Sequence, residues 1–240
     1  MSNRIKQACS PTILFILLMC FGFLFFSEQV LSHGVDESTK KFLLENQGAA
    51  IFPFLYIGAK HMLTGYDHIL FLVGVVFFLF KNKDIVIYVS LFTLGHSTTL
   101  ILGVFTDLQI NAYLIDAIIG FSVIYKGFDN LGGWRRLLGF QPNTRVAVTI
   151  FGLFHGLGLA TKLQEFQIPE DGLITNIISF NIGVEIGQIL ALILVVLFLR
   201  VWRKNENYMR LSVVTNTLLM SAGVLLILLQ LTSYAAINIG

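Results

Sequence analysis

Six long apolar segments restrict this 240-residue chain to one fold class. The sequence is 55% hydrophobic and only 12% charged, whereas soluble domains carry roughly 25% charged residues. An α-helix of about 20 apolar residues crosses the hydrocarbon core of a bilayer. The segments are close to that length or longer: 51–80, 85–105, 111–127, 146–163, 173–202 and 211–236. We therefore predict an all-α polytopic membrane protein whose lipid-embedded domain, residues 51–240, contains six transmembrane helices.

The first 32 residues have the three regions of a secretory signal peptide. A basic start is followed by the apolar run 13–26 and by Val-Leu-Ser, which predicts cleavage after Ser32. If this segment is not cleaved, it is a first transmembrane helix and the total is seven. In either case residues 33–50 form a short extracytoplasmic segment.

Basic residues alternate with the apolar segments and predict the orientation. Positive charge marks the cytoplasmic side of a membrane protein. The basic connections follow the first, third and fifth segments: Lys81, Lys83, Lys126, Arg135, Arg136, Arg145, Arg203, Lys204 and Arg210. The opposite connections are acidic, with Lys162 the exception. We expect a bacterial inner-membrane protein with both mature termini outside. The net charge is only +2, and the charged residues are distributed by membrane side and do not form a basic patch. Nucleic acid is therefore not an expected partner.

Seven histidine and acidic side chains lie within the apolar segments: His61, His68, His96, His155, Asp67, Asp116 and Glu185. Burying such groups in a bilayer is expensive, so they usually mark a pathway or a binding site. With the predicted orientation, the residues near the midplane come from four helices: His68, His96, His155 and Glu185. The alternative is that each is a hydrogen-bonding group at a helix interface. Four at one depth favour a shared ion or proton site.

Gly65 lies between His61 and His68, which are seven residues apart. On a regular helix their side chains would share a face about 10 Å apart, too far to bind one ion. The segment is longer than a span requires, so a tilted, kinked or broken helix is expected. Asp67 would point about 100° away from His68 on an ideal helix, either as a ligand or as a partner of another histidine.

Further polar candidates follow from spacing. Asn181, Glu185 and Gln188 are spaced by four and three residues, which places them on one helical stripe. Cleavage after Ser32 would make His33 the mature N-terminus, where amine and imidazole together could chelate Cu(II) or Ni(II); a plain polar tail is the alternative. Asp116 fits a pathway and a structural role equally well.

The available ligand types restrict the metal. Both cysteines, Cys9 and Cys20, fall in the predicted signal peptide, so the mature chain would have no thiolate ligand and no disulfide. Imidazole and carboxylate ligands suit divalent transition metals and disfavour a Cu(I) chain. The sequence therefore predicts a site for Ni, Co or Zn, with Cu and Fe also compatible.

Four ordered motifs resemble those of the HupE/UreJ family of membrane proteins. They are GYDHILF at 65–71, FTLGHS at 92–97, FGLFHGLG at 151–158 and FNIGVEIGQ at 180–188. The resemblance covers roughly residues 58–190; Asp116 stands where we would expect glutamate. It implies a cleavable signal followed by about six helices, and nickel or cobalt permeation linked to hydrogenase and urease maturation. It also implies five functional positions: Asp67, His68, His96, His155 and Glu185.

Three function classes compete at this stage. The first is a divalent-metal permease with a His/carboxylate site near the midplane, entered from outside near His33 and Asp116, with a metal-delivery or metalloenzyme-maturation partner. No nucleotide-binding motif is present, so an ion gradient, protons or a partner would drive transport. The second is an intramembrane zinc-dependent hydrolase with Asp67 or Glu185 as general base. The third is a metal-assembled accessory subunit. The sequence does not determine the oligomeric state.

Overall fold

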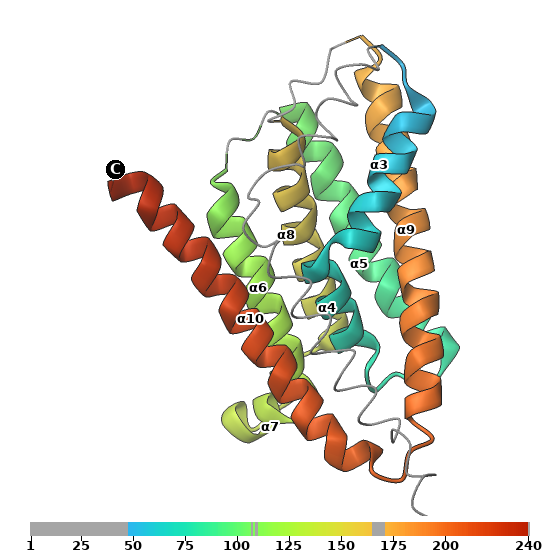
Figure 1. The fold of residues 1–240 in the computed structure, drawn as a ribbon, viewed down its shortest axis with the longest axis vertical. Helices are drawn as coiled ribbons and strands as arrows, with labels where there is room; N and C mark the ends of the chain where they lie inside the picture. The colour runs from blue at the N-terminus through green and yellow to red at the C-terminus, as the bar shows by residue number, and fades with distance from the viewer. Residues whose placement is uncertain (1–47, 107, 109, 165–170, 240) are drawn as a thin grey trace, which may run out of the picture.

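The computed structural model describes residues 48–106, 108, 110–164 and 171–239, and all regular secondary structure among them is helical (Figure 1). The helices are α3 (Ile51–Thr64), α4 (Tyr66–Val76), α5 (Asn82–Thr106), α6 (Ala112–Asn130), α7 (Gly133–Leu138), α8 (Thr144–Gln164), α9 (Leu173–Trp202) and α10 (Tyr208–Ile239). Each predicted apolar segment contains at least one helix. The predicted signal peptide and His33 lie outside the described residues.

Four helices in this part of the chain are long and apolar enough to cross a membrane: α5, α8, α9 and α10. The α4 helix is apolar but shorter, and α3 and α6 do not meet the same length and composition requirement. The all-helical membrane architecture is therefore confirmed, whereas the count of six spans stays a prediction.

Glycines bring the helices together in three close pairs. In the α5–α8 pair, a methyl group at Gly156 would clash with the carbonyl oxygen of His96. In the α3–α9 pair, one at Gly183 would clash with the carbonyl oxygen of Leu55. The α6–α10 pair meets at Gly223, where a methyl group would lie 2.8 Å from the carbonyl oxygen of Gly120. Small residues allow this backbone approach between helices in lipid.

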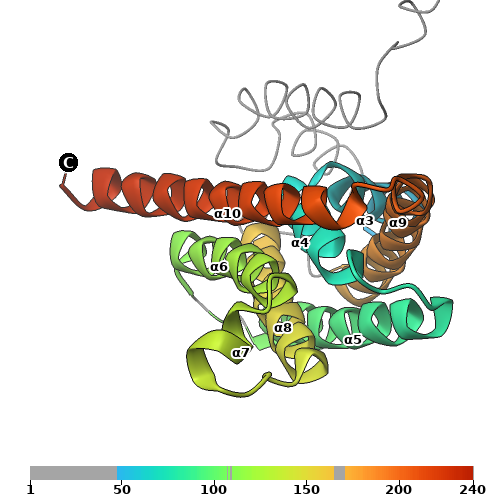
Figure 2. The same cartoon turned by 90° about the horizontal axis from the view of Figure 1, so that it is seen from below.

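The first apolar segment is broken at Gly65, as predicted. The α3 helix ends at Thr64 and α4 begins at Tyr66, while Gly65 between them has an extended ψ of 97°. A methyl group at Gly65 would lie 2.9 Å from the carbonyl oxygen of His61. The break turns the chain so that α4 lies among the three helix pairs (Figure 2).

The α4 helix ends inside the protein, and carbonyl groups at and just after its end accept hydrogen bonds from the side chains of Arg203 and Tyr208. The Arg203 guanidinium donates hydrogen bonds to the carbonyl oxygens of Val76 at 2.6 Å, Phe77 at 2.6 Å and Leu79 at 2.8 Å. The Tyr208 hydroxyl donates a further bond of 2.8 Å to Phe77. These bonds supply partners for carbonyl groups at and beyond the end of α4, where the helix itself offers none.

Two apolar clusters form the core. One lies toward the beginning of α3 and includes Phe54, Leu100 and Phe180; the other surrounds α4 and includes Phe71 and Phe77. The basic connections lie together at the α7 end of the bundle (Figure 1). There Arg200 donates a 2.6 Å hydrogen bond to Asn82 in the first basic connection. We call this the basic end and the opposite one the acidic end.

Candidate metal centre

Four histidines converge between the two apolar clusters. His68, His96 and His155 are at most 4% exposed, and His61 is half-buried. The His68 ring centroid lies 5.1 Å from that of His61, 5.9 Å from His96 and 4.7 Å from His155. The break at Gly65 explains the first distance, because a regular helix would hold His61 and His68 about 10 Å apart.

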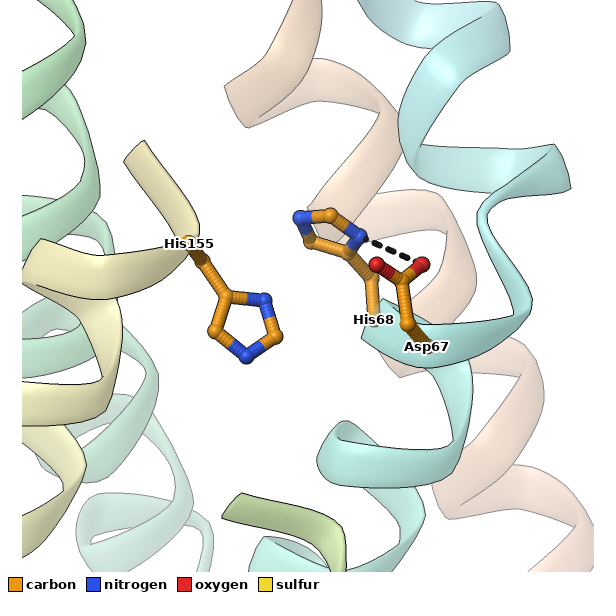
Figure 3. A group of neighbouring side chains, drawn as sticks. All are labelled: Asp67, His68 and His155. Atoms are coloured by element: carbon orange, nitrogen blue, oxygen red, sulfur yellow. Dashed lines mark hydrogen bonds and ion pairs between the residues drawn. The ribbon is translucent and has the colours of Figure 1, made fainter. Parts of the chain in front are cut away.

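Asp67 joins this group from the first turn of α4. Its Oδ1 lies 3.0 Å from Nδ1 of His68, so the carboxylate orients that imidazole directly. Figure 3 shows His155 reaching from α8 toward Asp67 and His68 on α4. One ligand atom from each of these three residues lies within 4.8 Å of the other two. The sequence placed Asp67 as a ligand or as a partner of another histidine, whereas in the structure it contacts the adjacent His68.

Ser122 orients His155 in a comparable way. Its hydroxyl donates to the carbonyl oxygen of Ile119 at 2.6 Å and lies 3.3 Å from Nε2 of His155. Because the hydroxyl proton is directed at the carbonyl oxygen of Ile119, the serine oxygen accepts a hydrogen bond from Nε2–H of His155. We infer this tautomer from the hydrogen bonds. It leaves the Nδ1 lone pair of His155 available as a ligand.

Five buried imidazole nitrogens have no hydrogen-bond partner among the described residues. They are Nε2 of His61, Nε2 of His68, Nδ1 and Nε2 of His96, and Nδ1 of His155. Buried polar atoms are nearly always paired, since each unpaired one costs about 1–3 kcal/mol. A cation that binds several of these nitrogens would account for the cluster.

The donor set suits a borderline transition metal. Neutral imidazoles with one carboxylate are ligands for Ni, Co and Zn, and the group found among the described residues contains no cysteine. Tetrahedral ligands about 2.1 Å from a metal lie about 3.4 Å from one another. The group of Asp67, His68 and His155 spans up to 4.8 Å, so ligand binding requires the α4 and α8 side chains to approach by about 1 Å.

An aromatic layer closes the cluster toward the basic end. Phe92 lies with its ring centroid 5.1 Å from His155 and 5.2 Å from Phe71, which itself lies 5.3 Å from His155. Phe151 extends the layer at 5.8 Å from Phe71. We call Phe71, Phe92 and Phe151 the phenylalanine layer. It places apolar rings between the histidines and that side of the membrane.

A small cavity of about 10 Å³ lies beside this layer, bounded by His68 and Gln188 among other residues. The Thr93 hydroxyl donates a 2.9 Å hydrogen bond to Oε1 of Gln188, which leaves Nε2 of that amide buried and without a described partner. Gln188, a secondary metal-site candidate from the sequence, lines the same cavity as His68.

The structure does not bring Glu185 to the histidines, contrary to our expectation of a four-helix set at the midplane. The side chain is exposed on the outer face of α9. Gly183 and Gly187 pack on the α3 backbone. Glu185 lies about 200° around the helix from Gly183 and about 160° from Gly187, which places it on the opposite face of α9. Close glycine packing therefore turns Glu185 outward. Asn181 is half-buried, with an unpartnered Oδ1 among the described residues.

Asp116 pairs with a residue that the sequence marked only as a charge exception. Both carboxylate oxygens contact Nζ of Lys162, at 3.2 and 3.0 Å. Sequence reasoning also missed Ser122 and Thr93, because hydroxyl residues in a transmembrane helix usually bond to their own backbone. Only Lys162 had a usable signal, since it follows His155 by seven residues on one helix face.

Apolar helices around a buried cluster of imidazoles and a carboxylate define a polytopic α-helical membrane protein with a candidate metal centre. A family model described as HupE / UreJ protein matches residues 37–238. The chain therefore belongs to the HupE/UreJ family, as its motifs indicated, and this membership implies a role related to nickel or cobalt transport. Comparisons with curated proteins and with solved structures give no match.

Proposed function

We propose that the protein is a permease for a divalent transition metal, nickel or cobalt, which binds in transit to His68, His96, His155 and Asp67. The observation that carries this proposal is the set of five buried imidazole nitrogens without partners in the described structure. Neutral imidazoles bind and release such a cation, whereas cysteine thiolates would hold it more tightly. His61 and Gln188 border the site and serve as secondary contacts.

The proposed topology has six spans in a bacterial inner membrane. The broken α3–α4 segment and α6 complete the set with α5, α8, α9 and α10. The basic end faces the cytoplasm by the positive-inside rule, so both mature termini and the Asp116–Lys162 pair face outward. The metal enters from that side, passes the histidines and leaves past the phenylalanine layer. An ion gradient, protons or a metal-delivery partner supplies the driving force.

Family membership favours a permease over an intramembrane zinc hydrolase that uses the same residues with Asp67 as base. The two functions also require different metal retention. A hydrolase keeps its catalytic zinc through purification, whereas a permease must load and unload. Exposed Glu185 is poorly placed to be the hydrolase base.

The test is metal analysis by mass spectrometry of the detergent-purified protein after chelator washing, followed by rebinding of Ni²⁺ and Co²⁺. We expect little retained metal in the wild type, saturable rebinding near one ion per chain, and loss of rebinding in His68→Ala and His155→Ala. The matched control is Glu185→Gln, which should rebind as the wild type does. One retained zinc per chain, absent from the histidine variants, would overturn the permease in favour of a hydrolase.

A further inference from the structure

Lys162 and Asp116 form an ion pair between α8 and α6 at the acidic end of the bundle. The contact is bidentate, with Nζ 3.0 and 3.2 Å from the two carboxylate oxygens. The Lys162 side chain is 34% exposed and the Asp116 side chain 13%. The Lys162 side chain is therefore partly exposed, while the Asp116 side chain is nearly buried.

The ion pair is directly above the histidine cluster. Lys162 follows His155 by two turns on one face of α8, which corresponds to about 10 Å. A methyl group at Gly158, between these residues, would lie 3.5 Å from Oδ1 of Asp116. Lys162 also interacts electrostatically with Asp67 and with His61. The lysine thus acts on the carboxylates of two neighbouring helices.

We infer that Lys162 is a tethered counter-cation of the metal-free site, which an entering divalent ion displaces from the carboxylate of Asp116. This inference rests on the proposed function. Among the described residues near the entrance, Asp67 and Asp116 supply two carboxylates and Lys162 supplies one ammonium. A bound divalent ion would neutralise both carboxylates, provided that the ammonium moves toward solvent.

The second ion pair between charged residues of the bundle differs in a way that supports this role. Lys126 and Asp129 lie on one helix, α6, with side chains only 8% and 5% exposed. Asp129 also accepts hydrogen bonds from Gln141 and Thr144, which fix the connection to α8. That pair is enclosed and structural. The Lys162–Asp116 pair instead joins two helices, and its side chains are more exposed, at 34% and 13%.

A displaceable counter-cation and a merely structural ion pair predict opposite results for one substitution. Lys162→Gln removes a positive charge about 10 Å from the site, so the affinity for Co²⁺ or Ni²⁺ should increase on the order of tenfold. Asp116→Asn removes an attracting charge and releases the ammonium toward Asp67, so the affinity should fall by a similar factor. The double variant should bind more tightly than Asp116→Asn alone.

Isothermal titration of the detergent-purified protein with Co²⁺ measures these affinities, and thermal unfolding reports folding of each variant. Lys83→Gln, at an exposed lysine in the first turn of α5 at the basic end, is the control for loss of one positive charge and should leave the affinity unchanged. Weaker or unchanged binding in folded Lys162→Gln overturns the counter-cation. Absence of Co²⁺ binding in the wild type instead overturns the proposed function, so the two failures are distinguishable.

Discussion

At the scale of single residues, the candidate site depends on which imidazole nitrogen faces the metal. Asp67 contacts Nδ1 of His68, and Ser122 contacts Nε2 of His155. The unpartnered nitrogens of these two residues are the opposite ones, Nε2 and Nδ1. Each imidazole is therefore oriented by one neighbour and offers its second nitrogen to a ligand, as histidine ligands of metals do.

Ser122→Ala tests this arrangement. Without the hydroxyl, Nε2 of His155 has no acceptor and the tautomer with a free Nδ1 lone pair is no longer favoured. We expect about tenfold weaker Co²⁺ binding, at the lower end of the 10–100-fold range for residues that orient ligands. Titration calorimetry measures the change. Ser221→Ala, an exposed serine on α10, is the control. Equal affinity in the two variants would show that Ser122 does not orient His155.

At the scale of helices, glycine contacts determine where the ligands stand. The α5–α8 pair carries His96 and His155, and its backbones meet where Gly156 faces the carbonyl oxygen of His96. The α3–α9 pair carries His61 and Gln188 and is joined in the same manner by Gly183. The histidine cluster therefore forms where the pairs meet, and its geometry depends on their separation.

Gly156→Ala should move α5 away from α8. The added methyl group meets backbone, which cannot rotate away, and overpacking of this kind costs about 1–3 kcal/mol of stability. We expect both a lower unfolding temperature and loss of Co²⁺ binding, measured by thermal unfolding and titration in detergent.

Gly158→Ala is the matched control on the same helix. Its nearest atoms belong to the side chains of Ile115 and Ile119 at 3.1 Å, which can shift by a few tenths of an ångström. This variant should keep most of the binding. Equal loss in both variants would mean that any added methyl group on α8 is damaging, and that backbone approach at Gly156 is not the cause.

At the scale of the whole molecule, the histidine cluster is separated from the basic end by the phenylalanine layer. On the acidic side it is bordered by charged and polar groups of Asp67, Asp116 and Lys162. An ion can exchange water for ligands on the polar side, whereas apolar rings offer no substitute for hydration. In the described conformation, a cation therefore meets polar and charged groups on the acidic side of the cluster and apolar rings on the basic side.

Phe92→Ala should weaken this barrier. The side chain is 6% exposed and lies against His68 and His155, so its removal leaves space between the site and the basic end. We expect severalfold faster passive Co²⁺ entry into proteoliposomes, followed with an enclosed fluorescent chelator.

Phe77→Ala is the control for general loosening. Phe77 is fully buried in the same apolar cluster, but its ring stacks on Tyr208, meets Trp202 edge-on, and has no ring contact with a histidine of the described residues. Both truncations should destabilise the fold by about 3–5 kcal/mol. Only Phe92→Ala should increase the flux; an equal increase in Phe77→Ala would attribute the leak to loss of packing.

The sequence by itself determined the helical membrane architecture, the family and the break at Gly65. Lengths of apolar runs and local spacing carry that information, because lipid allows few solutions for an unpaired backbone. The same spacing could not decide how each helix is rotated about its axis. Glycine contacts between helices fix that rotation, and they turned Glu185 outward. Only the tertiary structure therefore decided which nitrogens are free and that Lys162 pairs with Asp116.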